Sequence, residues 1–449
     1  MTDRSELTTV VLSPPPTPNG PLHVGHLAGP YVAADIAVRE ARRGGRRIFA
    51  LCGLDDHQNY VLAKARQERA DVLDVRNRYA RLIRDAFARA GVVHDGFTQP
   101  LTEPGYRSAV TGFLGELVGS GALPVQEWST PACPSCRGVA HHAYVSGRCP
   151  HCGAECGGGT CEGCGGYTPA ARLVDPRCTR CGSAATGEKT VRGPVLPLEE
   201  HRAALEAAWC TAILPARARE LAARLLAEDP MPVVPLSYPT DWGIELGAGT
   251  PGHRLDVWAE MGLGYLYTIG RHLQPAATGL REHVAAWQGL DSLWAFLGLD
   301  NAFYYLAMFP ALFAAAGVPA QKLLGGLVVN EFYRLEGQKF STSRNHAVWA
   351  NELLEKEDPR AVRAFIAWDR PAPHPTNFTL DRFRTTTDAW DLDGGQAPVD
   401  PNELARAESA LTLEHFDAAL AARCLLGTNG AAPCGPLDAI IGSGKAADR

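Results

Sequence analysis

The sequence lacks any long hydrophobic run and any strong net charge. No uninterrupted stretch of about 20 apolar residues exists, so no segment is expected to cross a membrane as a helix. The first residues, Met1–Glu6, have no apolar core, and we expect no secretory signal there. The net charge of −6 excludes a general basic footprint for nucleic acid, although it leaves room for a local basic patch. We therefore expect a cytoplasmic protein.

The cysteines gather in one short block. Nine of the 13 cysteines lie between residues 133 and 181 of a chain of 449 residues. Eight of them form Cys-x-x-Cys pairs: Cys133/Cys136, Cys149/Cys152, Cys161/Cys164 and Cys178/Cys181. Two such pairs complete the four-thiolate shell of structural zinc, so four pairs predict two zinc ions. Reduced surface thiols are the alternative, but they would not require such regular pairing.

The spacing does not decide which pairs share an ion. We favour nested pairing, in which Cys149/Cys152 joins Cys161/Cys164, while sequential and interleaved pairing stay open. Cys156 is the ninth cysteine of the block and is available as a competing ligand. A closed four-sulfur shell leaves no open position for a substrate, so we expect structural ions.

Two histidines mark the end of the first predicted strand. The apolar run Thr8–Leu12 predicts this strand, and Leu27–Arg42 predicts the helix that follows it. His23 and His26 lie between them, with Gly25 leaving space for a ligand against the backbone. In an open α/β sheet this is where nucleotides bind, and imidazoles there can donate to phosphate oxygens. Ordinary surface histidines are the alternative.

Two later predicted strands each lead to a carboxylate. Arg46–Cys52 is followed by Asp55, and Trp294–Asn301 ends with Asp300. Carboxylates at the carboxyl ends of parallel strands lie at the ligand crevice. For each, the alternative is a helix cap; for Asp300 it is also a solvated loop carboxylate.

The sequence motifs resemble those of a known family. The string Pro-Asn-Gly-Pro-Leu-His-Val-Gly-His, residues 18–26, resembles the HIGH signature of class I aminoacyl-tRNA synthetases in its methionyl form. Glu336–Asn345 resembles the family's KMSKS loop, and Asp241–Ile244 its Asp-Trp-Gly element. The cysteine block is similar to the connective peptide of two-knuckle methionyl-tRNA synthetases. The resemblance covers about residues 8–385.

This resemblance implies an α/β fold: a class I synthetase Rossmann-type parallel sheet with an inserted zinc-knuckle connective peptide and a short C-terminal helical region. It divides the chain into a first Rossmann half (1–120), the insertion (121–235), the second half (236–345), a stem-contact-like helical region (346–426) and a flexible tail (427–449). Within these units we expect helical structure over Leu198–Ala227 and Glu352–Trp368, a strand and turn over Asp256–Tyr265, and one helix over Glu403–Leu426. One such helix would be too short for the family's anticodon-binding bundle.

The resemblance also assigns roles to individual residues. Catalytic groups would be His23, His26 and Lys339. The nucleotide would contact Asn19, Gly25, Asp300, Asn301, Phe340, Ser341 and Ser343, with Mg²⁺ accompanying ATP. The amino acid would contact Pro15, Thr17, Asp55, Trp258, Met261, Tyr265 and Tyr305, with Asp55 holding its α-ammonium group. Trp258 has core packing as its alternative.

Several positions depart from the family pattern. Pro15 and Thr17 stand where the family has leucine and tyrosine, Met261 replaces a small alanine, and Tyr305 replaces a histidine. These changes predict a different amino acid, smaller or more polar than methionine. Thr342 replaces the second loop lysine, which predicts slower activation unless Arg344 substitutes for it.

Our main hypothesis is a repurposed ligase. It would form an aminoacyl-adenylate from ATP and pass the acyl group to a small-molecule acceptor, an N-hydroxylated amino acid or an amine. Such chemistry would be similar to that of the methionyl-tRNA-synthetase-like domains of hydrazine-forming biosynthetic enzymes, with a cupin-type enzyme as a partner. One alternative is a truncated methionine-tRNA ligase. The other is a catalytically inactive binding protein, and the intact signature residues argue against this second alternative.

Overall fold

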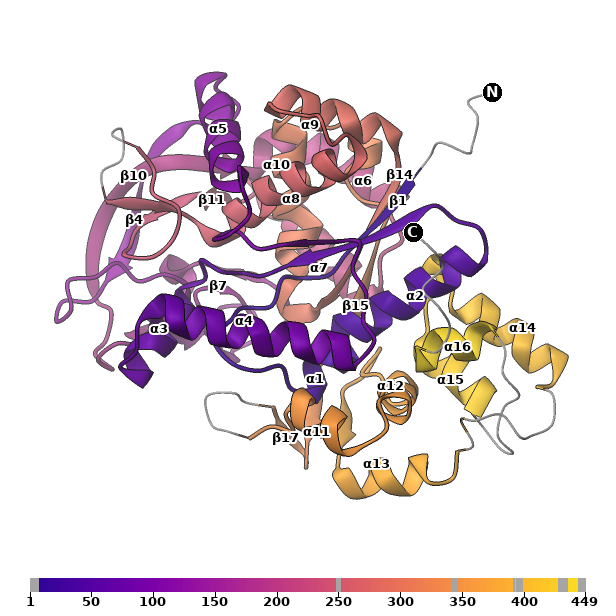
Figure 1. Cartoon of the computed structure of the whole chain (residues 1–449). Coiled ribbons are helices and arrows are strands. Elements are labelled where there is room, and N and C mark those ends of the chain that lie inside the picture. The colour runs from indigo at the N-terminus through magenta and orange to yellow at the C-terminus, as the bar shows by residue number, and fades with distance from the viewer. Residues whose placement is uncertain are drawn as a thin grey trace.

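A parallel five-stranded sheet forms the centre of the molecule (Figure 1). The structure is a computed structural model that describes residues 8–247, 252–340, 346–390, 392, 399–426 and 435–442. The strands lie in the order β15 (Gly326–Asn330), β14 (Leu290–Gly298), β1 (Thr8–Leu12), β2 (Ile48–Gly53) and β3 (Gly96–Thr98). The predicted α/β fold with a parallel sheet is thus confirmed, and β1 spans the residues predicted for it.

The order of the strands creates a crevice beside β1. This strand pairs with β2 on one side and with β14 on the other, and Val11 lies opposite both Ala50 and Trp294. The first half of the sheet therefore extends away from β1 in one direction and the second half in the other. At such a switch point the carboxyl ends of the two central strands leave room for a ligand.

Helices cover both faces of the sheet. Leu12 and Leu51 pack in one apolar core with residues of α5 (Tyr106–Gly119), α8 (Val257–Leu273) and α10 (Phe309–Ala315). On the other face, Val11 and Phe296 pack against α2 (Val32–Arg43). The remaining helices of the first half, α3 (Asn59–Glu68) and α4 (Val72–Arg89), lie along the same side as α2 in Figure 1.

The first helix is broken rather than continuous. The chain forms α1 (Val24–His26), then a π-helical turn over Leu27–Tyr31, and only then α2. Pro30 has no amide hydrogen to donate, and Gly29 has a non-helical ψ of −109°. The prediction of a single helix over Leu27–Arg42 is therefore wrong at its start.

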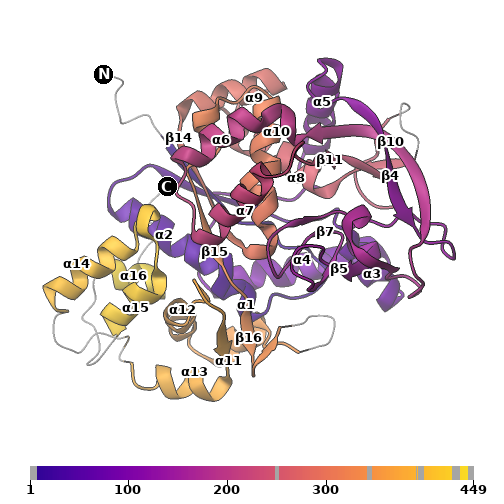
Figure 2. The ribbon, with the colours of Figure 1, turned by 180° about the vertical axis from the view of Figure 1, so that it is seen from behind.

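The insertion is a β-rich module. Its frame is a long antiparallel ribbon of β4 (Val125–Ala132) and β10 (Gly187–Pro197), the latter also pairing with β11 (Val233–Pro235). Its short strands are β5 (Val145–Arg148), β6 (Glu155–Gly157), β7 (Gly159–Thr160), β8 (Tyr167–Thr168) and β9 (Val174–Cys178), and most cysteines of the block lie in the turns that flank them. Figure 2 shows this module beside the carboxyl ends of the sheet strands, on the side of α3.

Two predicted elements around the insertion need correction. The helical segment Leu198–Ala227 contains two main helices, α6 (Arg202–Thr211) and α7 (Ala216–Leu226), separated at Pro215. Residues 256–265 form no strand, because Asp256 caps the start of α8 by accepting from the amides of Trp258 and Ala259. The two glycines of this segment allow close helix packing, and Gly264 lies against the Tyr106 ring.

Six further elements lie outside the central sheet and precede or accompany the C-terminal helices. They are β12 (Ser237–Pro239), β13 (His253–Leu255), α9 (Leu280–Ala286), β16 (Tyr333–Leu335), β17 (Gln338–Lys339) and β18 (Thr376–Phe378). None of the described helices combines the length and the apolarity that a membrane crossing needs.

The C-terminal region holds more helices than the sequence indicated. Its described helices are α11 (Ala350–Lys356), α12 (Pro359–Trp368), α13 (Leu380–Thr387), α14 (Pro401–Ala410), α15 (Ala418–Leu426) and α16 (Gly435–Ile441). The single helix predicted over Glu403–Leu426 is two helices, and α16 lies inside the predicted flexible tail. Helix α16 is held against α12 and α2 by Arg363 of α12. The buried guanidinium of Arg363 donates to the carbonyls of Ala439 and Ile440 in α16 and to Asp35 of α2.

Candidate active site

The two signature histidines bind each other's backbone. His23 caps α1, and its Nδ1 accepts from the amide of His26 at 3.3 Å, while His26 Nδ1 accepts from the amide of His23 at 3.1 Å. Their rings stack with centroids 3.7 Å apart. An imidazole whose Nδ1 accepts carries its proton on Nε2 when neutral. Each Nε2–H is therefore left without a hydrogen-bond partner among the residues that the structure describes.

The surroundings keep these histidines neutral. Burial lowers the pKa of His26 to about 4. Burial, followed by the nearby His26 and Lys339, lowers the pKa of His23 well below its usual value. A Cβ at Gly25 would come within 3.1 Å of the His23 ring, so the glycine makes room for that ring. At neutral pH the pair is a set of two uncharged donors.

The second signature segment reaches the same place through Phe340. Its ring is buried and stacks on His23 with centroids 4.7 Å apart. Lys339 pairs with Glu162, which lies in the insertion between Cys161 and Cys164. Ser341 and Ser343 lie outside the described residues, as do Thr342 and Arg344. The structure thus brings one lysine of this segment and one acidic residue of the cysteine module together.

Asp300 lies where β14 ends. It is in a 3₁₀ turn with Asn301, and Thr160 of the insertion donates to its backbone carbonyl at 2.5 Å. Burial, then the charge of Glu162, raises the pKa of its carboxyl to about 6, against the opposing charge of Lys339. Asn19 lies on the loop after β1, where its amide donates to the Thr17 carbonyl at 2.9 Å.

Asp55 lies in the turn after β2. It is 5% exposed and accepts from Thr17 Oγ1 at 3.1 Å and from Gln58 Nε2 at 3.4 Å. Burial raises the pKa of this carboxyl to about 8, and the charge of Glu260 adds to the shift. The residue is therefore a buried carboxyl with weak partners, which would gain from a cationic ligand.

Two ion pairs beside Asp55 escaped the sequence analysis. Asp56 accepts two hydrogen bonds of 2.7 Å from the buried Arg76, which fixes the turn after β2. His57 Nδ1 lies 2.8 Å from Glu260 of α8. Burial works to lower the pKa of His57, but Glu260 outweighs it and the pKa is raised. The run Asp55-Asp56-His57 directly after a strand was the signal available in the sequence.

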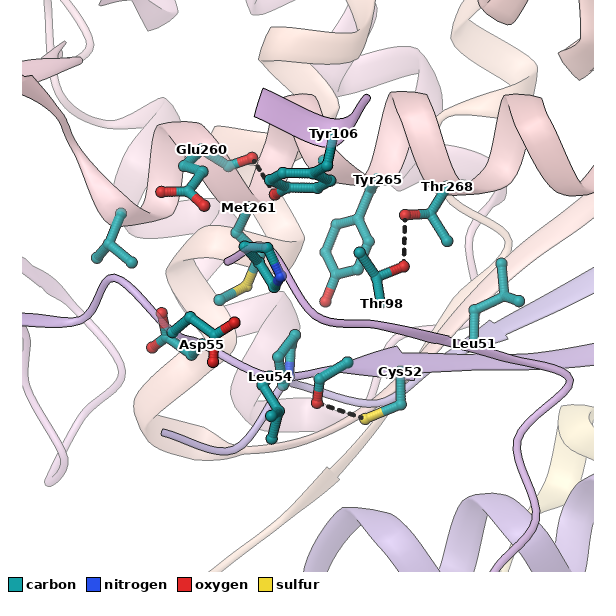
Figure 3. A pocket seen from close by; sticks show the side chains of 16 residues that line it. Leu51, Cys52, Leu54, Asp55, Thr98, Tyr106, Glu260, Met261, Tyr265 and Thr268 are labelled. Atoms are coloured by element: carbon teal, nitrogen blue, oxygen red, sulfur yellow. Dashed lines mark hydrogen bonds between the residues drawn. The ribbon is translucent and has the colours of Figure 1, made fainter. Parts of the chain in front are cut away.

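Asp55 faces an almost filled pocket (Figure 3). The cavity is about 30 Å³, and its lining includes Pro15, Asp55, Met261 and Tyr265. Figure 3 shows Met261 extending from α8 toward the turn that carries Asp55. The Tyr265 hydroxyl lies 2.5 Å from that of Tyr305, which donates to Met261 Sδ at 3.9 Å. Four of the residues predicted from the sequence thus meet around this pocket, and Tyr305 supports it from behind.

Trp258 is the exception among these predicted contacts. Its ring stacks on Tyr304 with centroids 3.6 Å apart. The two rings line a separate cavity of about 20 Å³ next to Tyr238 and Asp256, under the insertion. The structure therefore does not bring Trp258 into the lining of the cavity beside Met261.

The cysteines form two compact groups. Cys133, Cys136, Cys178 and Cys181 make one group, and Cys149, Cys152, Cys161 and Cys164 the other, with the sulfurs of each within 4.8 Å of one another. Tetrahedral zinc with bonds of about 2.3 Å places its sulfurs about 3.8 Å apart. The pairs Cys133–Cys181 and Cys149–Cys164 have separations of 3.6 and 3.8 Å. Both groups fit zinc, and the nested pairing is confirmed.

Cys156 belongs to neither group. Its Sγ lies 3.9 Å from Thr168 Oγ1, in the buried centre of the module. Cys156 is therefore a packing residue rather than a competing ligand.

A larger cavity lies next to the filled pocket. It measures about 550 Å³, and its lining includes His57, Glu103, Arg107, Ser108 and Trp242. Pro100 lines both this cavity and the pocket beside Asp55. Trp242 is held there by a hydrogen bond of 3.1 Å to the Asp56 carbonyl. The predicted Asp-Trp-Gly element thus forms part of a second space close to Asp55.

These features define an α/β protein of the Rossmann class with a signature-histidine crevice and two zinc knuckles. The family model described as tRNA synthetases class I (M) matches residues 9–390, and the chain belongs to this family of ligases. The family covers both halves of the sheet and the insertion between them.

Relatives agree with this membership, and a solved structure has a similar fold. The chain is 30% identical over 372 residues to a methionine–tRNA ligase of Methanobrevibacter smithii, and 32% identical over 391 residues to one of Porphyromonas gingivalis. These alignments cover 82% and 85% of this chain but 54% and 56% of those proteins, so the chain spans about half their length. The fold is similar to that of Mycobacterium tuberculosis methionyl-tRNA synthetase in complex with methionyl-adenylate. The TM-score is 0.69 and the identity 18%, covering 93% of this chain and 81% of the other.

Proposed function

We propose that this protein activates an amino acid with ATP and transfers the aminoacyl group to a small-molecule acceptor. The observation that supports activation is the pair of neutral histidines at α1, whose Nε2–H groups have no partner among the described residues. Uncharged donors held by their own backbone need no rearrangement when negative charge develops beside them, and this is how preorganised donors accelerate a reaction.

In the proposed activation, the amino-acid carboxylate forms a bond to the α-phosphorus of ATP and pyrophosphate leaves. His23 and His26 donate to the α-phosphate oxygens, and Lys339 balances the charge of the pyrophosphate. Asp55 accepts from the α-ammonium group, and Asp300 accepts from the two ribose hydroxyls. Mg²⁺ would accompany ATP and neutralise phosphate charge, held mostly by the phosphates. The contribution of the protein is positioning and electrostatics.

In the proposed transfer, the nucleophile of the acceptor forms a bond to the acyl carbon, loses its proton, and AMP leaves. The cavity of about 550 Å³ beside Asp55 supports a small acceptor, since small-molecule sites have this size. Its lining holds Arg107 and Glu103, the latter also paired with Arg271 at 2.7 Å, and charges of both signs suit an amino-acid-like acceptor such as an N-hydroxylated amino acid or an amine. A cupin-type enzyme that consumes the product remains part of this proposal.

A second candidate is methionine-tRNA ligation. The names of the relatives favour it. Single-turnover transfer from the purified adenylate complex separates the two: we expect loss of the aminoacyl group to hydroxylamine and to small amines, but not to tRNA. Rapid transfer to methionine tRNA would contradict the small-acceptor half of the proposal. A failure to release AMP with any amino acid would contradict activation itself and favour an inactive binding protein.

A further inference from the structure

The amino-acid pocket contains a side chain of the protein itself. Met261 is 8% exposed and lies between the turn of Asp55 and the ring of Tyr265. Its sulfur accepts a hydrogen bond from Tyr305 at 3.9 Å. A thioether therefore already occupies the side-chain space next to the carboxyl that would hold the substrate's ammonium group.

The space that remains is very small. The cavity is about 30 Å³, compared with roughly 150 Å³ for an engineered apolar cavity that binds benzene and about 10–15 Å³ for a cavity that holds one water. The free space beside Met261 in this conformation therefore holds only one or two heavy atoms. A methionine side chain has four heavy atoms and would have to displace Met261 from a packed position, which well-filled interiors resist.

The pocket is also complete without a large ligand. The hydroxyls of Tyr265 and Tyr305 bond to each other at 2.5 Å, and those of Thr98 and Thr268 at 3.1 Å. None of these four hydroxyls needs a hydrogen bond from the substrate side chain. A small side chain therefore leaves no buried donor unpaired, which would otherwise cost binding free energy.

We infer that the substrate of this site is an amino acid with at most two side-chain heavy atoms, as in glycine, alanine or serine, and that Met261 sets this limit. The inference rests on the proposed activation reaction and adds the substrate class to it. Asp55 binds the ammonium group common to all candidates, so the exclusion of larger side chains falls on Met261, with Tyr265 and Tyr305 behind it.

The test measures AMP release with hydroxylamine as the trap, for glycine, alanine, serine, valine, leucine and methionine. For the wild type we expect kcat/KM for the best small amino acid to exceed that for methionine by at least about tenfold, since a pocket discriminates roughly 10- to 200-fold per methylene. Met261→Ala removes three heavy atoms and should raise the ratio of methionine to glycine by at least about tenfold.

Two further variants complete the design. Met261→Leu keeps the volume and should keep the small preference. Met231→Ala makes the same deletion at a buried site outside the pocket and should leave the ratio unchanged. A wild type that prefers methionine, leucine or valine would overturn the inference while supporting activation. The same holds if a folded Met261→Ala protein keeps the wild-type ratio. If none of the amino acids tested gives AMP release, the activation proposal is contradicted, and this inference with it.

Discussion

At the proposed nucleotide end of the crevice, no described residue pairs with the Nε2 donors of His23 and His26, whereas at the proposed amino-acid end Tyr265 and Tyr305 bind each other. In our proposal, the first end offers donors to the phosphate charge of the substrate. At the second end Met261 already occupies the pocket, so this end acts by limiting the size of the side chain that can bind. One crevice thus combines an electrostatic site with a steric one, and the two ends should respond differently to substitution.

The supports of the two ends also differ. Glu162 and Thr160 of the cysteine module contact Lys339 and the Asp300 carbonyl at the nucleotide end. The amino-acid end instead depends on α8, which supplies Met261 and Tyr265. We therefore expect damage to the zinc module to weaken ATP binding more than amino-acid binding.

The largest effect is expected for His26→Ala. It removes one free donor and the acceptor for the His23 amide, so we expect adenylate formation to fall by about 10²–10³-fold. KM for the amino acid should change little. Pre-steady-state pyrophosphate release measures the loss, and the exposed His415→Ala is the control. A loss below about fivefold would contradict the role given to this pair.

Asp55→Asn tests the amino-acid end. Removing the charged partner of the ammonium group should raise KM for the amino acid by about 10- to 150-fold, the effect of losing a charged hydrogen bond. KM for ATP should stay within about twofold. If both constants rise together, Asp55 is not specific to the amino-acid end.

The same variant has a stability signature. Because burial raises the pKa of Asp55 to about 8, the folded state keeps a proton between about pH 4 and pH 8 that the unfolded state releases. This carboxyl therefore destabilises the fold progressively as the pH rises through that window. Asp55→Asn cannot ionise, so its Tm should exceed that of the wild type at pH 8 by a few degrees and match it at pH 4. An equal difference at both pH values would argue against this titration.

Cys149→Ser tests the support of the nucleotide end. We expect the zinc content to fall from two ions per chain to one, because a four-thiolate shell loses a ligand. As Thr160 loses its hydrogen bond to the Asp300 carbonyl, KM for ATP should rise by about tenfold, more than KM for the amino acid. Metal analysis and the two KM values provide the measurement. Cys156→Ser should keep both ions, and loss of zinc from this control would reopen the assignment of ligands.

The smallest effect is expected for Glu162→Gln. This change releases Lys339 from its exposed ion pair, and such pairs contribute little. KM for ATP should fall by about two- to fivefold, with no change at the amino-acid end. Glu155→Gln, an exposed change in the same module, is the control. An increase in KM for ATP would show that Glu162 assists nucleotide binding instead of competing with it.

The sequence by itself determined much of this protein. The alternation of apolar runs with polar turns placed β1 correctly, and the ends of β1, β2 and β14 placed His23, His26, Asp55 and Asp300. Cys-x-x-Cys spacing predicted two zinc sites because two thiolates on one turn form a local unit. These features depend on residues near one another in the chain.

The tertiary structure alone decided the rest. It packed Gly264 of helix α8 against the Tyr106 ring. It joined the cysteine pairs, ordered α16 around Arg363, and brought Glu162 to Lys339. It also placed Met261 in the pocket beside Asp55, the proposed amino-acid pocket. Each of these is a contact between distant segments, and its energy depends on packing that no local stretch of sequence contains.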